Sequence, residues 1–167
     1  MKKVLSVLFA LLISATMWAN GKLESGSVAP LAHVNKVNFE IEFVSIHGMS
    51  EADFGNYEKD WFTDKPEVVG KILENANKKL KGTFNMMSNA GSEYTVKLVV
   101  NSISKKGNYS CEMQVLDAHK KVIAKWVDIK SKGGTFGTKL NLIKDGAEDL
   151  GKEVGSLLKS EVKKAKK

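Results

Sequence analysis

Residues 94–129 read YTVKLVVNSISKKGNYSCEMQVLDAHKKVIAKWVDI, and their pattern decides the fold of this chain. Apolar and polar side chains alternate along residues 94–101 and 109–115, which is the period of a strand with one buried face, and residues 122–129 return as a third strand. The connections Lys105–Asn108 and Asp117–Lys120 are short and polar. Such spacing predicts three consecutive strands of an antiparallel meander.

The segments before and after the meander complete the predicted fold. Residues 37–43 alternate in the same way and predict a strand that lies beside the meander. Residues 66–81 carry an apolar stripe after a Thr63-Asp64-Lys65-Pro66 start signal, with Gly82 as a left-handed cap, and predict a helix. Residues 83–87 predict a short strand, and the apolar stripe from residue 143 to residue 158 predicts a long second helix.

The expected fold class is therefore α/β (α+β), with a mixed, mainly antiparallel sheet and the order β-α-β-β-β-β-α. We expect both main helices to pack on one face of the sheet. Gly151 and Gly155 lie one turn apart within the second helix. Glycine costs about 1 kcal/mol relative to alanine in a helix, so we expect these two glycines to allow a close approach of the helix to the sheet.

Residues 1–19 have the three parts of a secretory signal peptide. Lys2 and Lys3 precede an apolar run over residues 4–13, and small residues lead to Ala19. The run is shorter than the roughly 20 apolar residues of a membrane-spanning helix. Cleavage is expected after Ala19, with Ala15 as the alternative. The protein is then periplasmic, outer-membrane-associated or secreted, and it is not a lipoprotein because no cysteine lies near the cut.

The rest of the chain is expected to form one domain. Residues 20–35 show little periodicity and predict a flexible leader, followed by a single domain over residues 36–167. Cys111 is the one cysteine and is predicted to be a small buried apolar residue. A fold without disulfides favours a bacterial exported protein over a eukaryotic one.

Basic residues are concentrated at the carboxyl end of the chain. Beyond residue 19 the sequence keeps 24 of its 26 basic residues and all 19 acidic residues, and five lysines lie within residues 159–167. Lysines near the carboxyl end of a helix interact favourably with the helix dipole. They also attract anionic lipid or glycolipid, which is the alternative interpretation. Nucleic acid is not an expected partner of an exported protein.

The sequence contains no recognisable catalytic or metal-binding constellation. His33, His47 and His119 are isolated from one another, whereas a zinc site needs three or four converging ligands. No serine lies in a G-x-S-x-G motif, and the acidic residues between 51 and 64 do not have the spacing of a calcium loop. We therefore expect no cofactor, no metal and no catalytic residue.

Four aromatic residues in the segment 47–64 form the first candidate site: Phe54, Tyr57, Trp61 and Phe62. A short helix or an ordered loop is expected here. One interpretation is that the rings cap the open end of the core. The other is that they form an interaction surface, because tryptophan and tyrosine are favoured anchors at interfaces.

The glycine-rich segment before the last helix is the second candidate site, formed by Gly133, Gly134, Gly137 and Lys139. Backbone N–H groups that precede a helix can contact an anion. The segment does not match a P-loop, because Gly137 is followed by Thr138-Lys139 rather than by Lys and then Ser or Thr. A flexible connection or tight turn is the alternative.

The predicted order of elements resembles the sheet-and-helix domain of cell-envelope accessory proteins. The resemblance rests on the leading strand, the Pro66–Lys81 helix, Gly82-Thr83-Phe84 entering a strand and Tyr94 opening the meander. Similar domains are the amino-terminal domain of the Tol-system translocation protein and the auxiliary outer-membrane lipoproteins of certain transporters. The chain also resembles small exported proteins of Bacteroidetes. The absence of a lipid-attachment cysteine departs from the lipoprotein members.

The resemblance implies an envelope role through protein contacts. We therefore expect an exported, non-enzymatic envelope protein that binds a protein or surface component through residues 47–64 and 133–139. One alternative is a carrier of a small ligand or glycolipid with the aromatic segment as its lid. A weaker alternative is a hydrolase.

Overall fold

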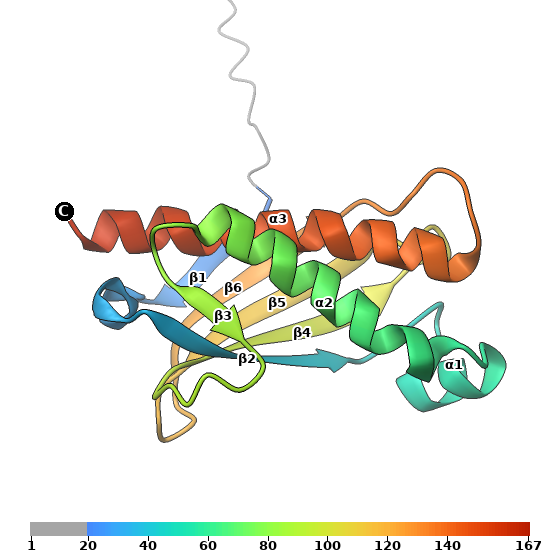
Figure 1. Ribbon diagram of the computed structural model, residues 1–167, viewed down its shortest axis with the longest axis horizontal. Helices are drawn as coiled ribbons and strands as arrows, with labels where there is room; N and C mark the ends of the chain where they lie inside the picture. Colours follow the sequence, from blue (N-terminus) through green and yellow to red (C-terminus); the bar gives the residue numbers. More distant parts are fainter. Residues whose placement is uncertain (1–19) are drawn as a thin grey trace, which may run out of the picture.

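The computed structural model describes residues 20–167. It shows a six-stranded mixed sheet with helices on one face (Figure 1). The predicted signal peptide, residues 1–19, lies outside the described residues. The elements in chain order are β1 (Lys22–Gly26), the 3-10 helix η1 (Ala29–His33), β2 (Lys36–Phe43), α1 (Glu51–Tyr57), α2 (Trp61–Leu80), β3 (Asn85–Met87), β4 (Thr95–Ile103), β5 (Tyr109–Leu116), β6 (Val122–Ser131) and α3 (Lys139–Ala165). The predicted α+β class is confirmed.

The sheet has the strand order β1-β6-β5-β4-β2-β3. Strands β4, β5 and β6 form the predicted antiparallel meander. Strand β2 lies beside β4 as expected, and it runs parallel to β4, with Phe39 opposite Val96. Strand β3 also pairs with β2 in parallel. The parallel pairings follow from the connection through α1 and α2, since a crossover brings the chain back in the same direction.

The prediction of a flexible leader over residues 20–35 is wrong. Residues 22–26 form β1, which pairs antiparallel with β6 from Lys22 opposite Val127 to Gly26 opposite Ala124. Leu31 in η1 is fully buried. The segment is held by backbone pairing to the edge of β6 and by a few isolated apolar side chains. Such contacts leave no periodic pattern in a segment this short, so the ordered domain begins earlier than residue 36.

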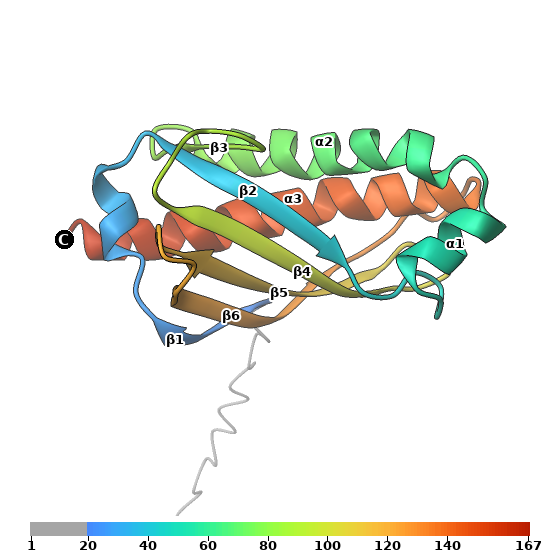
Figure 2. The same ribbon diagram turned by 90° about the horizontal axis from the view of Figure 1, so that it is seen from below.

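The two faces of the sheet differ in polarity. Helices α2 and α3 cover one face, as predicted (Figure 2). The other face carries ion pairs between strands: Lys125 Nζ lies 3.2 Å from Glu24 and 3.1 Å from Glu112, and Lys97 Nζ lies 2.9 Å from Glu42. Partly exposed pairs contribute little to stability. They do keep this face solvated.

Helix α2 begins five residues before the predicted Pro66, at Trp61. The Trp61 side chain is fully buried, and the helix starts where this ring enters the core. Pro66 lies inside the second turn, and the backbone N–H groups of Thr63 and Asp64 donate to Asp60 O over 3.1 and 2.9 Å. The predicted cap at Gly82 is confirmed by its φ of +80°.

Gly151 and Gly155 lie against helix α2 and not against the sheet, so the expected partner is corrected. A Cβ added to Gly151 would lie 2.4 Å from Ile72 O, and one added to Gly155 would lie 2.5 Å from Ala76 O. Contacts this short leave no space for a methyl group. The two glycines therefore allow α3 to lie directly on the backbone of α2, and the rising residue numbers on both helices show that they run in parallel.

Cys111 is buried on β5, as predicted. Burial raises the pKa of its thiol. Within residues 20–167, no helix combines the length and the apolar character needed to cross a bilayer.

We predict that Gly151→Ala and Gly155→Ala each lower the free energy of unfolding. Overpacking costs about 1–3 kcal/mol and more where backbone is displaced, which exceeds the roughly 1 kcal/mol that alanine gains in a helix. Urea unfolding followed by circular dichroism measures the change.

The matched control is Gly70→Ala in α2, where an added Cβ meets nothing within 4 Å. This variant keeps the helical preference for alanine without a clash, so its stability should rise by up to about 1 kcal/mol. Equal gains in all three variants would contradict the close helix contact.

Candidate functional site

Helix α1 and the start of α3 lie at the same end of the molecule (Figure 1). Ser50 begins α1, because its Oγ accepts a hydrogen bond from Asp53 N over 3.1 Å. Thr138 begins α3 in the same way, accepting from Asn141 N over 3.2 Å. These caps fix where each helix starts, and they bring the two segments singled out in the sequence to one place.

Phe54 and Trp61 belong to the core. Both are fully buried, and their rings contact each other edge to face with centroids 5.4 Å apart. The Trp61 ring also contacts Phe43 at 5.5 Å. The interpretation of a core cap is therefore confirmed for these two residues. A buried ring cannot contact a partner, so their assignment to an interaction surface is wrong.

Glu51 joins α1 to α2 at this end. The Trp61 indole Nε1 donates to Glu51 Oε1 over 3.1 Å, and Lys65 Nζ lies 2.6 Å from the same oxygen. The carboxylate thus satisfies the one polar atom of a buried tryptophan. This arrangement holds α1 in a fixed position relative to the core.

Tyr57 and Phe62 are exposed, with 59% and 56% of their surface accessible. Phe62 lies across Gly55, where an added Cβ would be 2.1 Å from its ring. Phe136 in the glycine-rich loop is the most exposed large apolar side chain of the described residues, at 89%. Three large rings are therefore accessible on segments of this end.

Lys139 connects the two candidate segments. Its Nζ donates to the Tyr57 hydroxyl over 2.8 Å, lies 4.3 Å from the centroid of the Tyr57 ring and is 3.8 Å from Glu58 Oε2. The hydrogen bond to Tyr57 raises the pKa of Lys139. Two predicted site residues that are 82 positions apart in the chain are thus in direct contact.

A pocket of about 320 Å³ opens beside this contact. We call it the end pocket; it is lined by His47, Met49, Tyr57, Lys105 and Lys139. Its walls combine a thioether and an aromatic ring with two lysines. Such a pocket can accept an apolar or aromatic group that carries a negative charge.

His47 forms the inner wall of the end pocket. Its backbone has a φ of +55°, and its ring lies edge to face with Phe54 at 5.0 Å. The Nε2 atom is buried and has no hydrogen-bond partner within residues 20–167. Burial lowers the pKa of His47, and the nearby Lys139 and Lys105 lower it further.

The glycines of the loop serve packing and do not form an anion cradle. The Gly133 N–H donates to Asn108 Oδ1 over 2.8 Å, and an added Cβ at Gly134 would lie 2.1 Å from the carboxylate of Asp145. Gly137 lies against Asn141 in the first turn of α3. The Gly133 N–H is therefore already hydrogen-bonded, and the Asp145 carboxylate beside Gly134 would repel an anion. Lys139 is the member of this predicted set that lines the end pocket.

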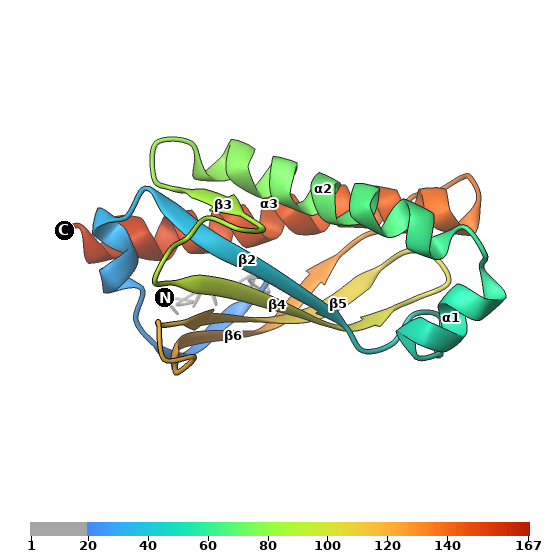
Figure 3. The ribbon, with the colours of Figure 1, turned by 60° about the horizontal axis from the view of Figure 1, so that its bottom comes forward.

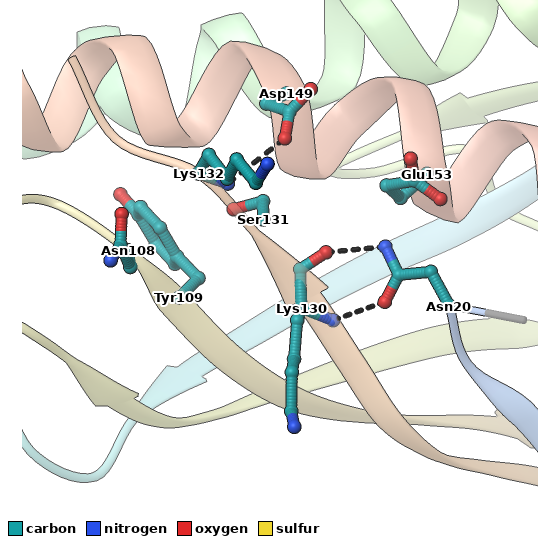
Figure 4. Close-up of a pocket in the computed structure, with 8 residues that line it drawn as sticks. All are labelled: Asn20, Asn108, Tyr109, Lys130, Ser131, Lys132, Asp149 and Glu153. Atoms are coloured by element: carbon teal, nitrogen blue, oxygen red, sulfur yellow. Dashed lines mark hydrogen bonds between the residues drawn. The ribbon is translucent and has the colours of Figure 1, made fainter. Parts of the chain in front are cut away.

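A second, larger pocket of about 570 Å³ lies at the start of the domain (Figure 4). The side chain of Asn20 bonds to both backbone groups of Lys130, and Lys132 N donates to Asp149 Oδ2 over 2.9 Å. Glu153 also lines it. Its polar groups largely form hydrogen bonds with one another, and the pocket lies where Asn20, the first described residue, bonds to β6.

The histidines and acidic residues were considered as metal ligands in the sequence, and no metal site was expected. Within the described part of the chain, no three His, Cys, Asp or Glu side chains are grouped as metal ligands would be. His33 and His119 are exposed and lie outside the end pocket.

The sequence did not single out Met49, Lys105 or Phe136 as site residues. Lys105 lies in the turn between β4 and β5, and only the tertiary fold brings it to α1. Phe136 carried one available signal: it is a large apolar residue within a loop of glycine and polar residues, where no core face is predicted.

Comparison with known proteins assigns no family to the chain. No family model matches it, and no curated protein matches it. Two solved structures of the PelC dodecamer from Paraburkholderia phytofirmans are similar. The first is 9% identical with a TM-score of 0.46 and covers 81% of this chain and 98% of the PelC chain. The second is 10% identical with a TM-score of 0.44 and covers 83% and 98%.

We predict that His47 makes the protein less stable in acid. Because the pKa of His47 is lowered in the folded state, the unfolded state binds more protons once the pH falls to about 6.5, the ordinary histidine value. The stability from neutral His47 is therefore complete above that pH and decreases below it. Thermal unfolding from pH 8 to pH 5 measures the effect.

The test variant is His47→Asn, since asparagine tolerates a positive φ. It should lose less stability than the wild type on going from pH 8 to pH 5. The exposed His119→Asn serves as control and should follow the wild type. A His47→Asn curve parallel to that of the wild type would rule out the effect.

Proposed function

We propose that this chain is an exported, non-enzymatic cell-envelope protein that binds another protein or a surface component. Binding occurs at the end surface, which we define as the end pocket together with the exposed rings of Phe62 and Phe136. The observation that carries the proposal is the contact of Lys139 with Tyr57 over 2.8 Å, beside an open pocket.

The composition of the end surface supports binding. Exposed apolar side chains that gather in one patch are typical of interaction sites, and aromatic side chains are favoured anchors at interfaces. Tyr57, Phe62 and Phe136 supply three such rings. Lys105 and Lys139 add positive charge at the rim, which selects a partner whose apolar group is accompanied by a carboxylate or another acid.

The support beneath the end surface also favours binding. The buried rings of Phe54 and Trp61 and the bridging carboxylate of Glu51 hold α1 in place. A surface that is already ordered loses little conformational entropy when a partner binds. Helix α1 therefore presents Tyr57 in a fixed position.

Export rests on the sequence pattern of residues 1–19. We predict that protein recovered from the envelope or the medium of the producing cells begins at Asn20, because the small residues before it fit the signal peptidase. Mass spectrometry of the intact protein measures this. Recovery of an uncleaved chain in the cytosol would contradict export, whatever the end surface binds.

We predict that the double variant Tyr57→Ala and Phe136→Ala reduces recovery of the crosslinked partner from an envelope fraction by at least about tenfold, as loss of anchor residues does. Met87→Ala with Val122→Ala is the matched control, because these side chains are also exposed, at 44% and 43%, and lie outside the end surface. A photo-crosslinking residue at position 136 should capture the same partner in the wild type.

The proposal fails if both double variants recover the partner equally, or if the residue at position 136 captures nothing while crosslinkers elsewhere do. Trp61→Ala is unsuitable for this test. It would leave a cavity in the core and cost about 3–5 kcal/mol of stability, so a loss of binding would report unfolding.

A further inference from the structure

Helices α2 and α3 end at the same end of the molecule, opposite α1 (Figure 3). Contacts along the pair establish this: Gly151 lies on Ile72, Gly155 on Ala76, and Lys159 Nζ donates to Lys79 O and Lys81 O over 2.8 and 3.0 Å. Both helix dipoles therefore point their negative ends in the same direction.

We call this region the lysine end. It consists of residues 74–81 and 159–167 and contains the lysines Lys78, Lys79, Lys81, Lys159, Lys163, Lys164, Lys166 and Lys167. The two segments hold eight lysines and two glutamates, whereas the rest of residues 20–167 holds 16 lysines and 17 acidic residues. The whole positive excess of the described chain is therefore located at one end.

The fold itself uses only part of this charge. Lys159 satisfies carbonyl groups at the end of α2, Lys78 pairs with Glu74 over 2.6 Å, and Lys164 pairs with Glu161. Each helix end carries about half a negative charge, so two ends offset about one lysine. A surplus of about five positive charges remains, and the lysines other than Lys159 are exposed.

We infer that the lysine end docks the protein on the anionic headgroups of a lipid bilayer. All of the basic residues are lysines, which act as hydrated point charges and lack the bidentate geometry with which arginine recognises an individual phosphate. Such a group suits a diffuse layer of negative charge. Each lysine that lies near the surface of an anionic membrane strengthens binding about fivefold.

The attachment is electrostatic. Among residues 20–167, none of the large apolar side chains that are substantially exposed belongs to the lysine end, so nothing there inserts into the hydrocarbon. Binding must therefore fall steeply with ionic strength, since the screening length is about 8 Å at physiological salt. The 27 residues of α3 extend about 40 Å at 1.5 Å per residue, which directs the end surface away from the bilayer.

The test is co-sedimentation of the purified protein with vesicles of phosphatidylcholine containing 0, 20 or 40% phosphatidylglycerol. We expect binding that increases with phosphatidylglycerol, is absent on pure phosphatidylcholine and is lost in 0.5 M salt. Equal binding to vesicles with and without phosphatidylglycerol, or no binding at 40% phosphatidylglycerol in low salt, would overturn the inference.

Two charge-matched triple variants locate the docking surface. Changing Lys163, Lys166 and Lys167 to glutamine should weaken binding by about a hundredfold, from about fivefold per lysine. Changing Lys59, Lys106 and Lys132, which are exposed elsewhere, should change it much less. Equal losses would show that net charge and not the lysine end is responsible. Thermal unfolding confirms that both variants are folded.

The docking inference and the proposed function fail separately. Tyr57→Ala with Phe136→Ala should bind vesicles like the wild type, because those residues lie at the opposite end. Preferential binding of the lysine end to duplex DNA over the anionic vesicles in the same buffer would also overturn the inference.

Discussion

The close packing of α3 on α2 is the constraint on which the rest of the structure depends. Gly151 and Gly155 bring the backbones of the two helices together and fix their register. Because the helices run in parallel, this contact brings the start of α3 near the start of α2, where Lys139 meets Tyr57 of the preceding helix α1, and it places Lys159 on the last carbonyl groups of α2 at the other end. Both functional proposals thus concern ends of the same helix pair.

Much of the fold could be predicted from the sequence because its strands have one buried and one solvated face. The meander and β2 show this alternation, and Gly82 marks the end of α2. The segment from residue 20 to residue 35 could not be predicted, because β1 depends on an edge of β6 that comes about 100 positions later. The partner of Gly151 was wrongly predicted for a related reason. A glycine indicates a close approach, but it does not say which element approaches.

The candidate site was predicted in part. Phe54, Tyr57 and Trp61 have the spacing of one continuous helical face, which would give them a common environment. The chain instead ends α1 at Tyr57 and begins α2 at Trp61. The three residues therefore lie on two helices with different orientations and do not share one face. Phe54 and Trp61 enter the core, while Tyr57 points outward to Lys139. The residues that complete the end pocket come from other turns and have no local signature.

The single thiol of this chain has a consequence for where the protein can work. Cys111 is buried within the sheet, and burial keeps it protonated by raising its pKa. A protonated, inaccessible thiol neither attacks a disulfide nor oxidises readily. Because the chain has one cysteine, forming this fold involves no disulfide oxidase or disulfide isomerase. No internal disulfide can form or break in a chain with one cysteine, so the redox potential of the surroundings does not act on this fold through a cystine bridge.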